Sequence, residues 1–246
     1  WREGAGIVSP YQVQLHNAGE YVVWRTSKQV GKRIVCRNTT LVDLTVFRLV
    51  MYEALNRGYI TTNPISRLRF KPDRAREKPA FSTEQIELIR GELKNWPEWM
   101  RVSFEIALHQ GCRLAETSVP MSDINCQEGT ITLLIKRGKR HTTALHPALV
   151  PLIASLAGRE KTCDLPMNPS KEWSKLFRKL RMVGYSFHCL RVTAITRLAR
   201  AGVAEGAATR YIGHASSAIH RLYQRLDIGD LGSCVSAINF RKKGEL

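Results

Sequence analysis

The sequence predicts a mainly α-helical protein with a small antiparallel β-sheet, an α+β fold in two domains. Apolar residues recur at helical spacing through most of the 246 residues. One β-rich hairpin interrupts this pattern at 130–145, and a charged stretch with two prolines, KPDRAREKP, interrupts it at 71–79. We therefore expect a helical domain at 1–72, a basic linker at 73–80, and a mixed domain with a C-terminal tail at 81–246. A long surface loop inside one domain is the alternative for the linker.

The charge balance predicts a polyanionic partner. Lys and Arg number 38 against 21 Asp and Glu, which gives a formal net charge of +17. Such a surplus causes self-repulsion unless nucleic acid or an anionic membrane compensates it. The longest nearly apolar stretch, 148–158, is too short to span a membrane, which favours nucleic acid. A hydrophobic share of 43% excludes a disordered tail.

The cysteine pattern argues against disulfides and zinc. The six cysteines are scattered, without CxxC spacing, and we expect reduced thiols, no metal and no cofactor. The sequence does not open with a secretory signal pattern, so we expect a cytoplasmic, nucleoid-associated protein without a membrane segment. The sequence starts without methionine, so residues that precede it could carry a further domain.

Helices are expected on both sides of the linker. In the first domain they cover 11–25 and 39–56, Gly58 stops the second, and Asn63-Pro64 forms a turn or a new helix start. This domain has little strand signal. In the second domain, Ser82 and Gln85 resemble a capping box. The helices expected there cover 82–93, 98–110, 168–182, 187–201, 204–212 and 216–226, and a hairpin pairs 130–136 with 140–145 around a glycine turn.

Two groups of basic residues in the first half of this domain are candidates for phosphate contacts. Arg113 follows the helix-stopping Gly111, and Glu116 is one turn away and can hold its guanidinium. Lys136 ends the first hairpin strand and Lys139 lies in the turn, so the tip fits a nucleic-acid groove. Taken alone, a surface Arg–Glu pair and a solvated turn explain these residues better.

Two further groups lie near the C-terminus. His188 and Arg191 share one face of a predicted helix because their positions are three apart. His214 follows Gly213 at a break between short helices, and Tyr223 is nine residues further on. Taken alone, a chance HxxR and an amphipathic core tyrosine explain these residues better.

Taken in order, the series Arg113…Glu116, Lys136, His188-x-x-Arg191, Gly213-His214 and Tyr223 resembles the catalytic signature of the tyrosine recombinase (phage integrase) family. The segments HCLRVTAITRLARAG and YIGHASSAIHRLY are its most specific part. YEALNRGYITTN, at 52–63, is similar to the last helix of the family's core-binding domain. The resemblance covers nearly the whole chain and is weakest before Thr39. It implies a helical core-binding domain that contacts DNA, followed by a mixed catalytic domain.

Three positions depart from the family pattern. Cys189 stands where the family often has an acidic residue, and Val192 stands where it often has His. The segment 116–123 is one residue shorter than usual and contains Pro120, so the helix after Arg113 is expected to end early. None of these changes removes a catalytic side chain, but they affect the support of His188 and the seating of Arg113.

The resemblance implies site-specific cleavage and rejoining of DNA through a 3′-phosphotyrosine intermediate, without metal or nucleotide. Tyr223 would be the nucleophile and His188 the base that takes its proton. Lys136 would protonate the leaving 5′-oxygen. Arg113, Arg191 and His214 would bind the phosphate, and Glu116 would support Arg113.

The basic residues around the linker and the hairpin are predicted to contact the DNA backbone. For the cluster around the linker, a charge run that is merely solvated is an equally good explanation. They are Lys71, Arg74, Arg76, Lys78, Arg137 and Lys139. The tail 226–246 has a short apolar stretch near Val235 and Ile238. It would dock on a neighbouring subunit in a tetramer on double-stranded DNA, or pack on its own domain. Accessory DNA-bending proteins are further expected partners.

Two other classes of function remain open at this point. A type IB topoisomerase-like enzyme or a hairpin resolvase would share the chemistry without needing two partner sites. A non-enzymatic DNA-binding module would keep the fold, but it would have no reason to keep a tyrosine at Tyr223.

Overall fold

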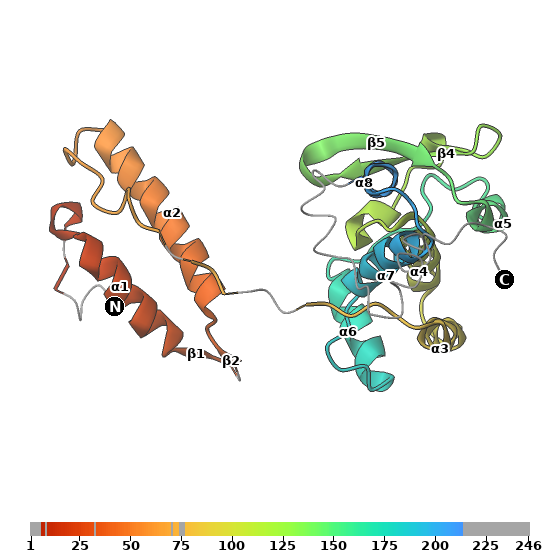
Figure 1. The fold of residues 1–246 in the computed structure, drawn as a ribbon, viewed down its shortest axis with the longest axis horizontal. Coiled ribbons are helices and arrows are strands. Elements are labelled where there is room, and N and C mark those ends of the chain that lie inside the picture. Colours follow the sequence, from red (N-terminus) through yellow and green to blue (C-terminus); the bar gives the residue numbers. More distant parts are fainter. Residues whose placement is uncertain (1–5, 8, 32, 70, 74–76, 214–246) are drawn as a thin grey trace, which may run out of the picture. The chain divides into compact units, whose positions relative to one another are not determined.

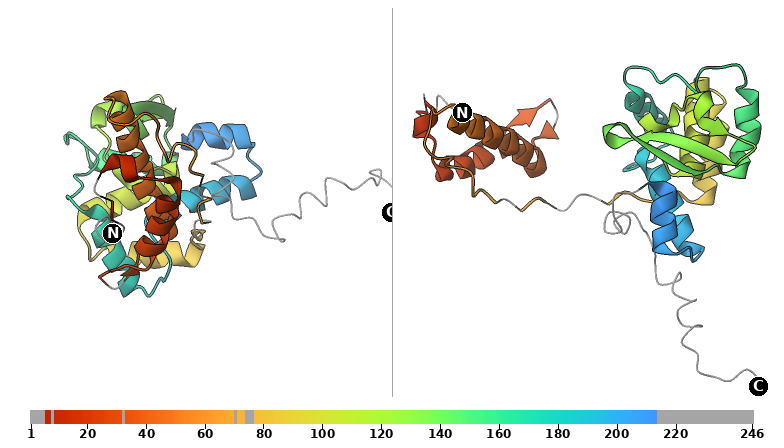
Figure 2. Two further views of the ribbon diagram at one scale, coloured as in Figure 1. Left: turned by 90° about the vertical axis from the view of Figure 1, so that its left-hand side faces the viewer. Right: turned by 90° about the horizontal axis from the view of Figure 1, so that it is seen from above.

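A computed structural model describes residues 6–7, 9–31, 33–69, 71–73 and 77–213. The chain divides into two compact units, Trp1–Arg76 and Glu77–Leu246. This division lies within the range 73–80 that the sequence analysis assigned to the linker. Figures 1 and 2 show the helices and strands of each unit.

The first unit is built on two long helices, α1 (Leu15–Thr26) and α2 (Arg37–Asn56). Its core includes Leu44 and Met51 from α2 and Ile65 from the following turns. The two helices are joined by a small hairpin of β1 (Gln29–Val30) and β2 (Arg33–Ile34). This hairpin was not predicted from the sequence, which has little strand signal here, since two-residue strands leave no detectable alternation.

Two asparagines fix the path of the chain after α2. Asn63 accepts a hydrogen bond from the Ile65 amide (3.1 Å) and donates one to the Arg48 carbonyl (3.2 Å), so Asn63-Pro64 forms a turn rather than a new helix. Asn38 donates to the Asp73 carbonyl (2.9 Å) and accepts from the Asp73 amide (2.8 Å). The chain therefore returns to the beginning of α2 before it leaves the unit.

The second unit is mostly helical with one three-stranded antiparallel sheet in the order β3-β4-β5. Figure 1 shows the sheet beside the helices, with α8 next to β5. The strands are β3 (Ile124–Asn125), β4 (Thr130–Ile135) and β5 (Lys139–Ala144). The helices are α3 (Thr83–Leu93), α4 (Glu98–Gln110), α5 (Val150–Ser155), α6 (Pro169–Lys179), α7 (His188–Arg200) and α8 (Glu205–Ile212).

Most of the predicted elements of this unit are present, with local differences. Ser82 caps α3 through the reciprocal hydrogen bonds of a capping box with Gln85, as predicted. The helix predicted to reach Met182 ends at Lys179 instead, because Arg181 adopts a left-handed conformation with φ of 55°. The short strand β3 was not predicted. The helix expected at 216–226 lies outside the described residues.

The core of this unit centres on α4 and α7. Phe104 of α4 is fully buried and stacks on Trp173 of α6, with ring centroids 6.2 Å apart. The chain joins this core at Phe81, whose amide donates a 2.8 Å hydrogen bond to the Thr193 hydroxyl of α7. The Phe81 ring stacks on Tyr185 at 4.8 Å. The N-terminal end of the unit is thus fastened directly to α7.

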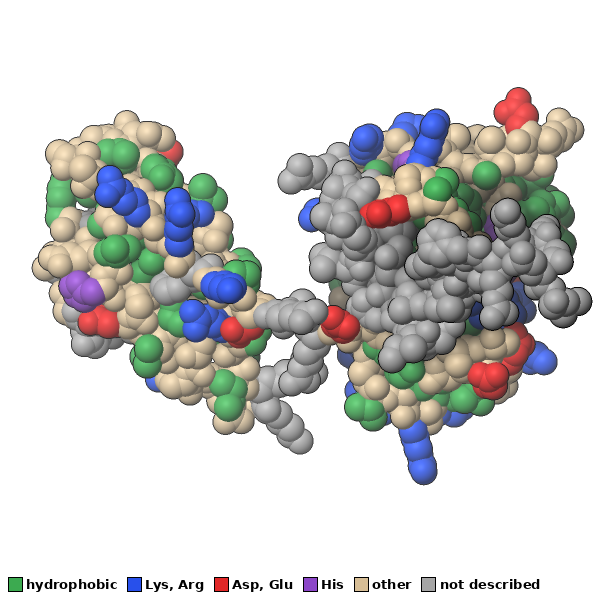
Figure 3. Space-filling model, in the orientation of Figure 1, with side chains coloured by type: hydrophobic (Ala, Val, Ile, Leu, Met, Phe, Trp, Pro, Cys, Tyr) green, Lys and Arg blue, Asp and Glu red, His purple; other side chains and the backbone are tan. Residues whose placement is uncertain are grey.

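The described surface carries many cations. In Figure 3, Lys and Arg side chains project from the visible face of each unit. Among the described residues, no helix is both long and apolar enough to cross a membrane. The five cysteines in the described part of the chain are free thiols, and Cys234 lies outside it.

Candidate active site

The site begins at the glycine that ends α4. Gly111 has φ of 62° and ψ of 20°, a left-handed conformation that favours glycine. A Cβ built at Gly111 would lie 2.2 Å from Cδ1 of Ile212 and 3.2 Å from Cβ of Ala194. Only glycine therefore fits this turn. The turn directs the chain out of the core two residues before Arg113.

Glu116 fixes Arg113 in place, as the spacing predicted. The 3₁₀ helix Leu114–Thr117 brings the carboxylate back, so that it accepts hydrogen bonds from the Arg113 amide and from Nη1, each 2.7 Å long. The Glu116 side chain is 4% exposed, whereas that of Arg113 is 38% exposed. A buried carboxylate therefore anchors a guanidinium that reaches the surface. The helix after Arg113 ends early, as Pro120 led us to expect.

Arg191 joins the same carboxylate from inside the core. Its side chain is 1% exposed, and Nη1 donates a 2.8 Å hydrogen bond to the Gly111 carbonyl oxygen. The same nitrogen lies 3.8 Å from Glu116 Oε2. A buried cation requires such compensation, because burial disfavours the charged form. Arg113 and Arg191, distant in sequence, thus meet at one acid.

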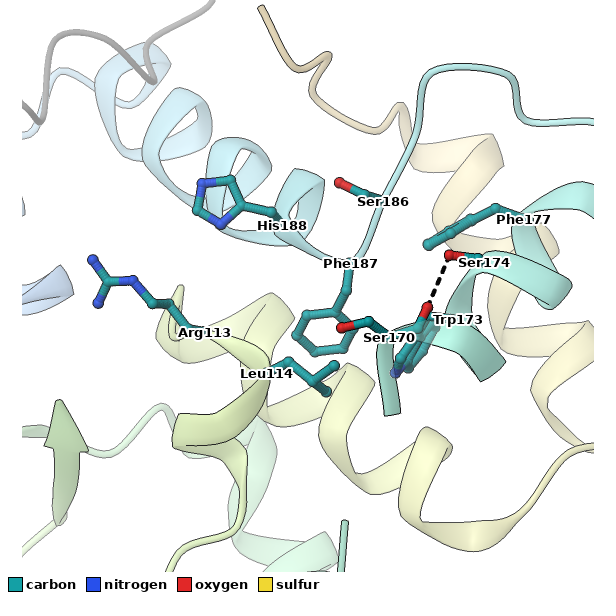
Figure 4. A pocket seen from close by; sticks show the side chains of 9 residues that line it. All are labelled: Arg113, Leu114, Ser170, Trp173, Ser174, Phe177, Ser186, Phe187 and His188. Carbon is teal, nitrogen blue, oxygen red and sulfur yellow. Dashed lines mark hydrogen bonds between the residues drawn. The ribbon is translucent and has the colours of Figure 1, made fainter. Parts of the chain in front are cut away.

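His188 begins α7, one turn before Arg191, and lies at the edge of a cavity of about 320 Å³. Figure 4 shows His188 and Arg113 extending on the same side of this cavity, opposite Trp173. Burial lowers the pKa of His188 below its usual 6.5, and the nearby cations of Arg191, Arg113 and Lys78 lower it further. The imidazole is therefore neutral at neutral pH.

The two departures on α7 leave this arrangement intact. Cys189 is buried, and its sulfur accepts a hydrogen bond from the Ser186 amide (3.3 Å) in the turn before the helix. Val192 is buried in the core. Neither residue occupies the cavity beside His188, so both act as packing residues at the start of α7.

Lys136 lies at the tip of the β4–β5 hairpin, in the 3₁₀ turn Lys136–Gly138, and is exposed. Ile135 pairs with Lys139 directly below the turn, and the register continues to Thr130 and Ala144. The turn glycine, Gly138, has φ of 71°. The hairpin thus presents Lys136 and the exposed Lys139 at its end.

The last described residues lie against the end of α4. The Tyr211 hydroxyl lies 2.7 Å from Gln110 Oε1, which also accepts from the His146 amide at 3.1 Å. The Gln110 side chain donates to the Ala144 carbonyl at 3.0 Å. α8 then ends at Gly213 in a left-handed conformation. His214 and Tyr223 lie outside the described residues.

Some of the predicted DNA-binding residues lie in the described part of the chain and others lie outside it. Lys71 and Lys139 are exposed, and Lys78 is half-buried close enough to His188 to affect its pKa. Arg74 and Arg76 fall outside the description, as does the side chain of Arg137. In the described ranges, no cluster of three or more His, Cys, Asp or Glu residues could hold a metal ion.

Sequence reasoning missed the second roles of Gly111, Gln110 and His141. Gly111 was predicted as a helix stop, but its carbonyl also receives Arg191. Gln110 and His141 were not singled out, although both contact Tyr211 of α8. No sequence signal identifies these contacts, because they join segments 70 to 101 residues apart.

Comparisons with known proteins identify the family of the chain. The family model described as "Phage integrase family" matches residues 80–228, more than half of the chain. No curated protein matches by sequence. Among solved structures, the Tn1549 transposon integrase in complex with circular intermediate DNA is similar, with a TM-score of 0.67 and 17% identity over 95% of this chain and 87% of that one.

Two other similar structures are also recombinases. The λ integrase dimer bound to a COC′ core site has a TM-score of 0.64 and 17% identity over 94% of this chain and 67% of that one. XerH recombinase in a post-cleavage complex with palindromic difH has a TM-score of 0.66 and 14% identity over 92% and 70%. The family match and the shared fold together establish that this chain belongs to the phage integrase family, the tyrosine recombinases, and is a DNA strand-transferring enzyme.

Proposed function

We propose that this protein is a site-specific DNA recombinase that cleaves and rejoins strands through a 3′-phosphotyrosine intermediate. The observation that carries the proposal is the convergence of Arg113 and Arg191 on the buried carboxylate of Glu116, at 2.7 and 3.8 Å. Beside them lies His188, whose pKa is lowered. The architecture of a core-binding unit followed by a catalytic unit is part of this proposal.

The guanidiniums of Arg113 and Arg191 can neutralise the negative charge of the phosphodiester. A DNA phosphodiester is anionic and repels nucleophiles, and charge spreads over its non-bridging oxygens in the transition state. Guanidiniums donate paired, charge-assisted hydrogen bonds to such oxygens. Because Glu116 holds Arg113 before DNA binds, little reorganisation is needed during the reaction. His214 would add a hydrogen bond to the same phosphate.

Tyr223 is the proposed nucleophile. Its phenol must lose a proton, since an ordinary tyrosine has a pKa of about 10 and is protonated at neutral pH. His188 is suited to accept that proton, because its lowered pKa keeps it neutral. The Tyr223 oxygen then bonds to phosphorus as the bond from phosphorus to the 5′-oxygen breaks.

Lys136 is the proposed general acid. The departing 5′-oxygen needs a proton, and an exposed lysine at a hairpin tip can reach the groove beside the cleaved step. The 5′-hydroxyl and the phosphotyrosine ester together conserve the energy of the original bond. Rejoining runs the same steps in reverse with the 5′-hydroxyl as nucleophile.

The proposed partner is double-stranded DNA that carries specific sites. The net charge of +17 and the exposed Lys71 and Lys139 support backbone contacts, which give strong salt dependence. Similar structures contain DNA, and one is described as a dimer on its core site. We propose assembly into a tetramer on DNA in the nucleoid, with DNA-bending proteins as accessory partners.

A suicide-substrate assay tests the proposal. Duplexes tiled across the DNA that flanks the gene carry a nick just 3′ of each candidate cleavage position, so the short 5′-hydroxyl fragment diffuses away and the covalent adduct accumulates. Wild type should yield a protein–DNA adduct that survives SDS. Tyr223→Phe should yield none, whereas Tyr59→Phe, at an exposed tyrosine of the first unit, should trap normally.

The other outcomes separate the alternatives. An equally strong adduct with Tyr223→Phe would show that another residue is the nucleophile. Relaxation of any supercoiled plasmid, without need for two sites, would indicate a topoisomerase-like enzyme. Tight DNA binding without any adduct across all duplexes would indicate a DNA-binding module that has lost catalysis.

A further inference from the structure

We propose that His141 is a positioning residue for strand cleavage, which caps α8 from strand β5 and so fixes the backbone at Gly213, the residue before His214 in the sequence. This inference rests on the proposed function. The hydrogen-bond contact of the His141 ring is with the Tyr211 carbonyl and not with Arg113 or Arg191. Its effect would therefore be transmitted through the end of α8.

The first support is a cross-element helix cap. The last carbonyl groups of an α-helix have no partner within the helix and need one from outside. His141 Nε2 lies 3.2 Å from the carbonyl oxygen of Tyr211, the penultimate residue of α8. A ring with hydrogen on Nε2 donates to this oxygen, as basic side chains commonly do at helix C-termini.

The second support is the close approach of His141 to Gly213. A Cβ built at Gly213 would lie 2.8 Å from Cδ2 and 3.0 Å from Nε2 of His141, closer than real Cβ atoms come. Gly213 also has φ of 73°, a conformation that glycine adopts without strain. The imidazole therefore lies directly against the residue that precedes His214.

The third support is that His141 lies within a paired β-ladder and that α8 packs on a second element, α4. His141 pairs with Leu133 in the middle of the β4–β5 ladder, and the Leu133 side chain is 1% exposed. On its other side α8 contacts the end of α4, where Ile212 packs over Gly111 and Tyr211 reaches Gln110. His141 and α4 thus hold the end of α8 between them. The same hairpin carries Lys136 at its tip.

Three variants separate the hydrogen bond from packing. His141→Gln keeps a donor at the reach of Nε2, and His141→Leu keeps bulk without the donor. Thr142→Val is the matched control, because Thr142 lies next to His141 but bonds to Thr132 across the strand at 2.8 Å. Melting temperature and DNA affinity are measured for each variant, so that misfolding is recognised. His141→Ala serves if the leucine variant misfolds.

The measured quantity is the single-turnover rate of adduct formation at saturating protein. We expect His141→Leu to slow this rate about three- to tenfold, the effect of one lost hydrogen bond. His141→Gln and Thr142→Val should stay within about twofold of wild type. A wild-type rate for His141→Leu, or an equally slow His141→Gln, would overturn the proposal.

A sulfur leaving group distinguishes positioning of α8 from an effect on the neighbouring Lys136. In a duplex with a 5′-bridging phosphorothiolate, the departing thiolate needs no proton, since thiols have far lower pKa values than alcohols. Lys136→Ala should regain most of its lost rate on this duplex, whereas His141→Leu should keep its defect. Recovery of His141→Leu would show that it acts through Lys136 and would overturn the proposal.

Failure of this inference differs visibly from failure of the proposed function. If wild type forms no adduct, or Tyr223→Phe forms one, the proposed function is wrong whatever His141 does. If wild type traps DNA through Tyr223 and the His141 variants behave like Thr142→Val, only the positioning role is wrong.

Discussion

The guanidinium of Arg191 donates a 2.8 Å hydrogen bond to the backbone carbonyl of Gly111, 80 residues earlier in the chain. The left-handed turn at Gly111 also directs the chain to Arg113, and Ile212 packs where a Cβ would stand. One residue without a side chain therefore organises contributions from α4, α7 and α8.

Gly111→Ala should destabilise the second unit and slow cleavage. The left-handed conformation alone costs about 1–2 kcal/mol for an L-residue, and the new methyl would also overlap Cδ1 of Ile212. Thermal unfolding should show a loss of about 3 kcal/mol. Gly158→Ala is the matched control, because Gly158 has φ of 83° with nothing within 4 Å of its built Cβ. Equal losses in the two variants would contradict the packing argument.

Glu116→Gln should weaken both folding and cleavage. The amide keeps the shape of the side chain but removes the charge that Arg113 and Arg191 share. Removing one partner of a buried ion pair costs about 3 kcal/mol, measurable by urea unfolding. The exposed control Glu87→Gln, which only loses a surface pair with Arg90, should change stability by less than about 1 kcal/mol. A Glu116→Gln variant with the stability and cleavage rate of wild type would contradict the shared role of this carboxylate.

Cleavage should fall on the acidic side of neutrality. In the proposed mechanism His188 accepts a proton and can do so only when neutral, and its pKa in the folded protein lies below the usual 6.5. The rate of adduct formation should therefore be level near pH 7 and decline once the pH falls through that lowered pKa. Stability contributed by the neutral imidazole is present above pH 6.5 and is lost over the same fall, because the unfolded chain binds the proton more readily.

Lys78→Gln should move this acidic limb to higher pH. The Lys78 cation is one cause of the lowered pKa of His188, so its removal stabilises the protonated imidazole. Lys139→Gln is a fair comparison, since both lysines are predicted DNA contacts and Lys139 is exposed at the hairpin. Single-turnover profiles at saturating protein should show the shift for Lys78→Gln alone. A shift in both variants would point to a general charge effect.

Thr193→Val should loosen the attachment of the linker end to α7. The Thr193 hydroxyl accepts the 2.8 Å hydrogen bond from the Phe81 amide, and valine would leave that buried donor without its acceptor. The expected loss is about 1–3 kcal/mol in unfolding experiments. Hydrogen exchange at the Phe81 amide should also accelerate. Thr193→Ser keeps the hydroxyl and should retain most of the protection.

The sequence was sufficient to predict elements whose signals are local. The capping box at Ser82, the helix Glu98–Gln110 and the hairpin with its glycine turn depend on neighbouring residues. The pairing of Arg113 with Glu116 was also predictable, because their positions are three apart and so lie within one turn. The roles of Lys136, His188, Arg191, His214 and Tyr223 were predicted only from the resemblance to the family.

Other features depend on contacts that no local pattern encodes. Helical spacing predicted α2, but it could not show that Leu44 and Met51 are buried while Val46 and Val50 are more than half exposed. In the same way, the meeting of Arg191 with Gly111 arises only when α7 packs against α4. Tertiary packing decides both, and the period of 3.6 residues does not.

The paired hydrogen bonds between Asn38 and Asp73 give the first unit a defined seam. Because this contact fixes the point at which the chain leaves the first unit, a replacement for the residues up to Asp73 that keeps the contact inherits the same exit. Chimaeras of related recombinases spliced directly after Asp73 should therefore fold as well as their parents, and a changed target preference among them would show that the first unit contributes to the choice of DNA site.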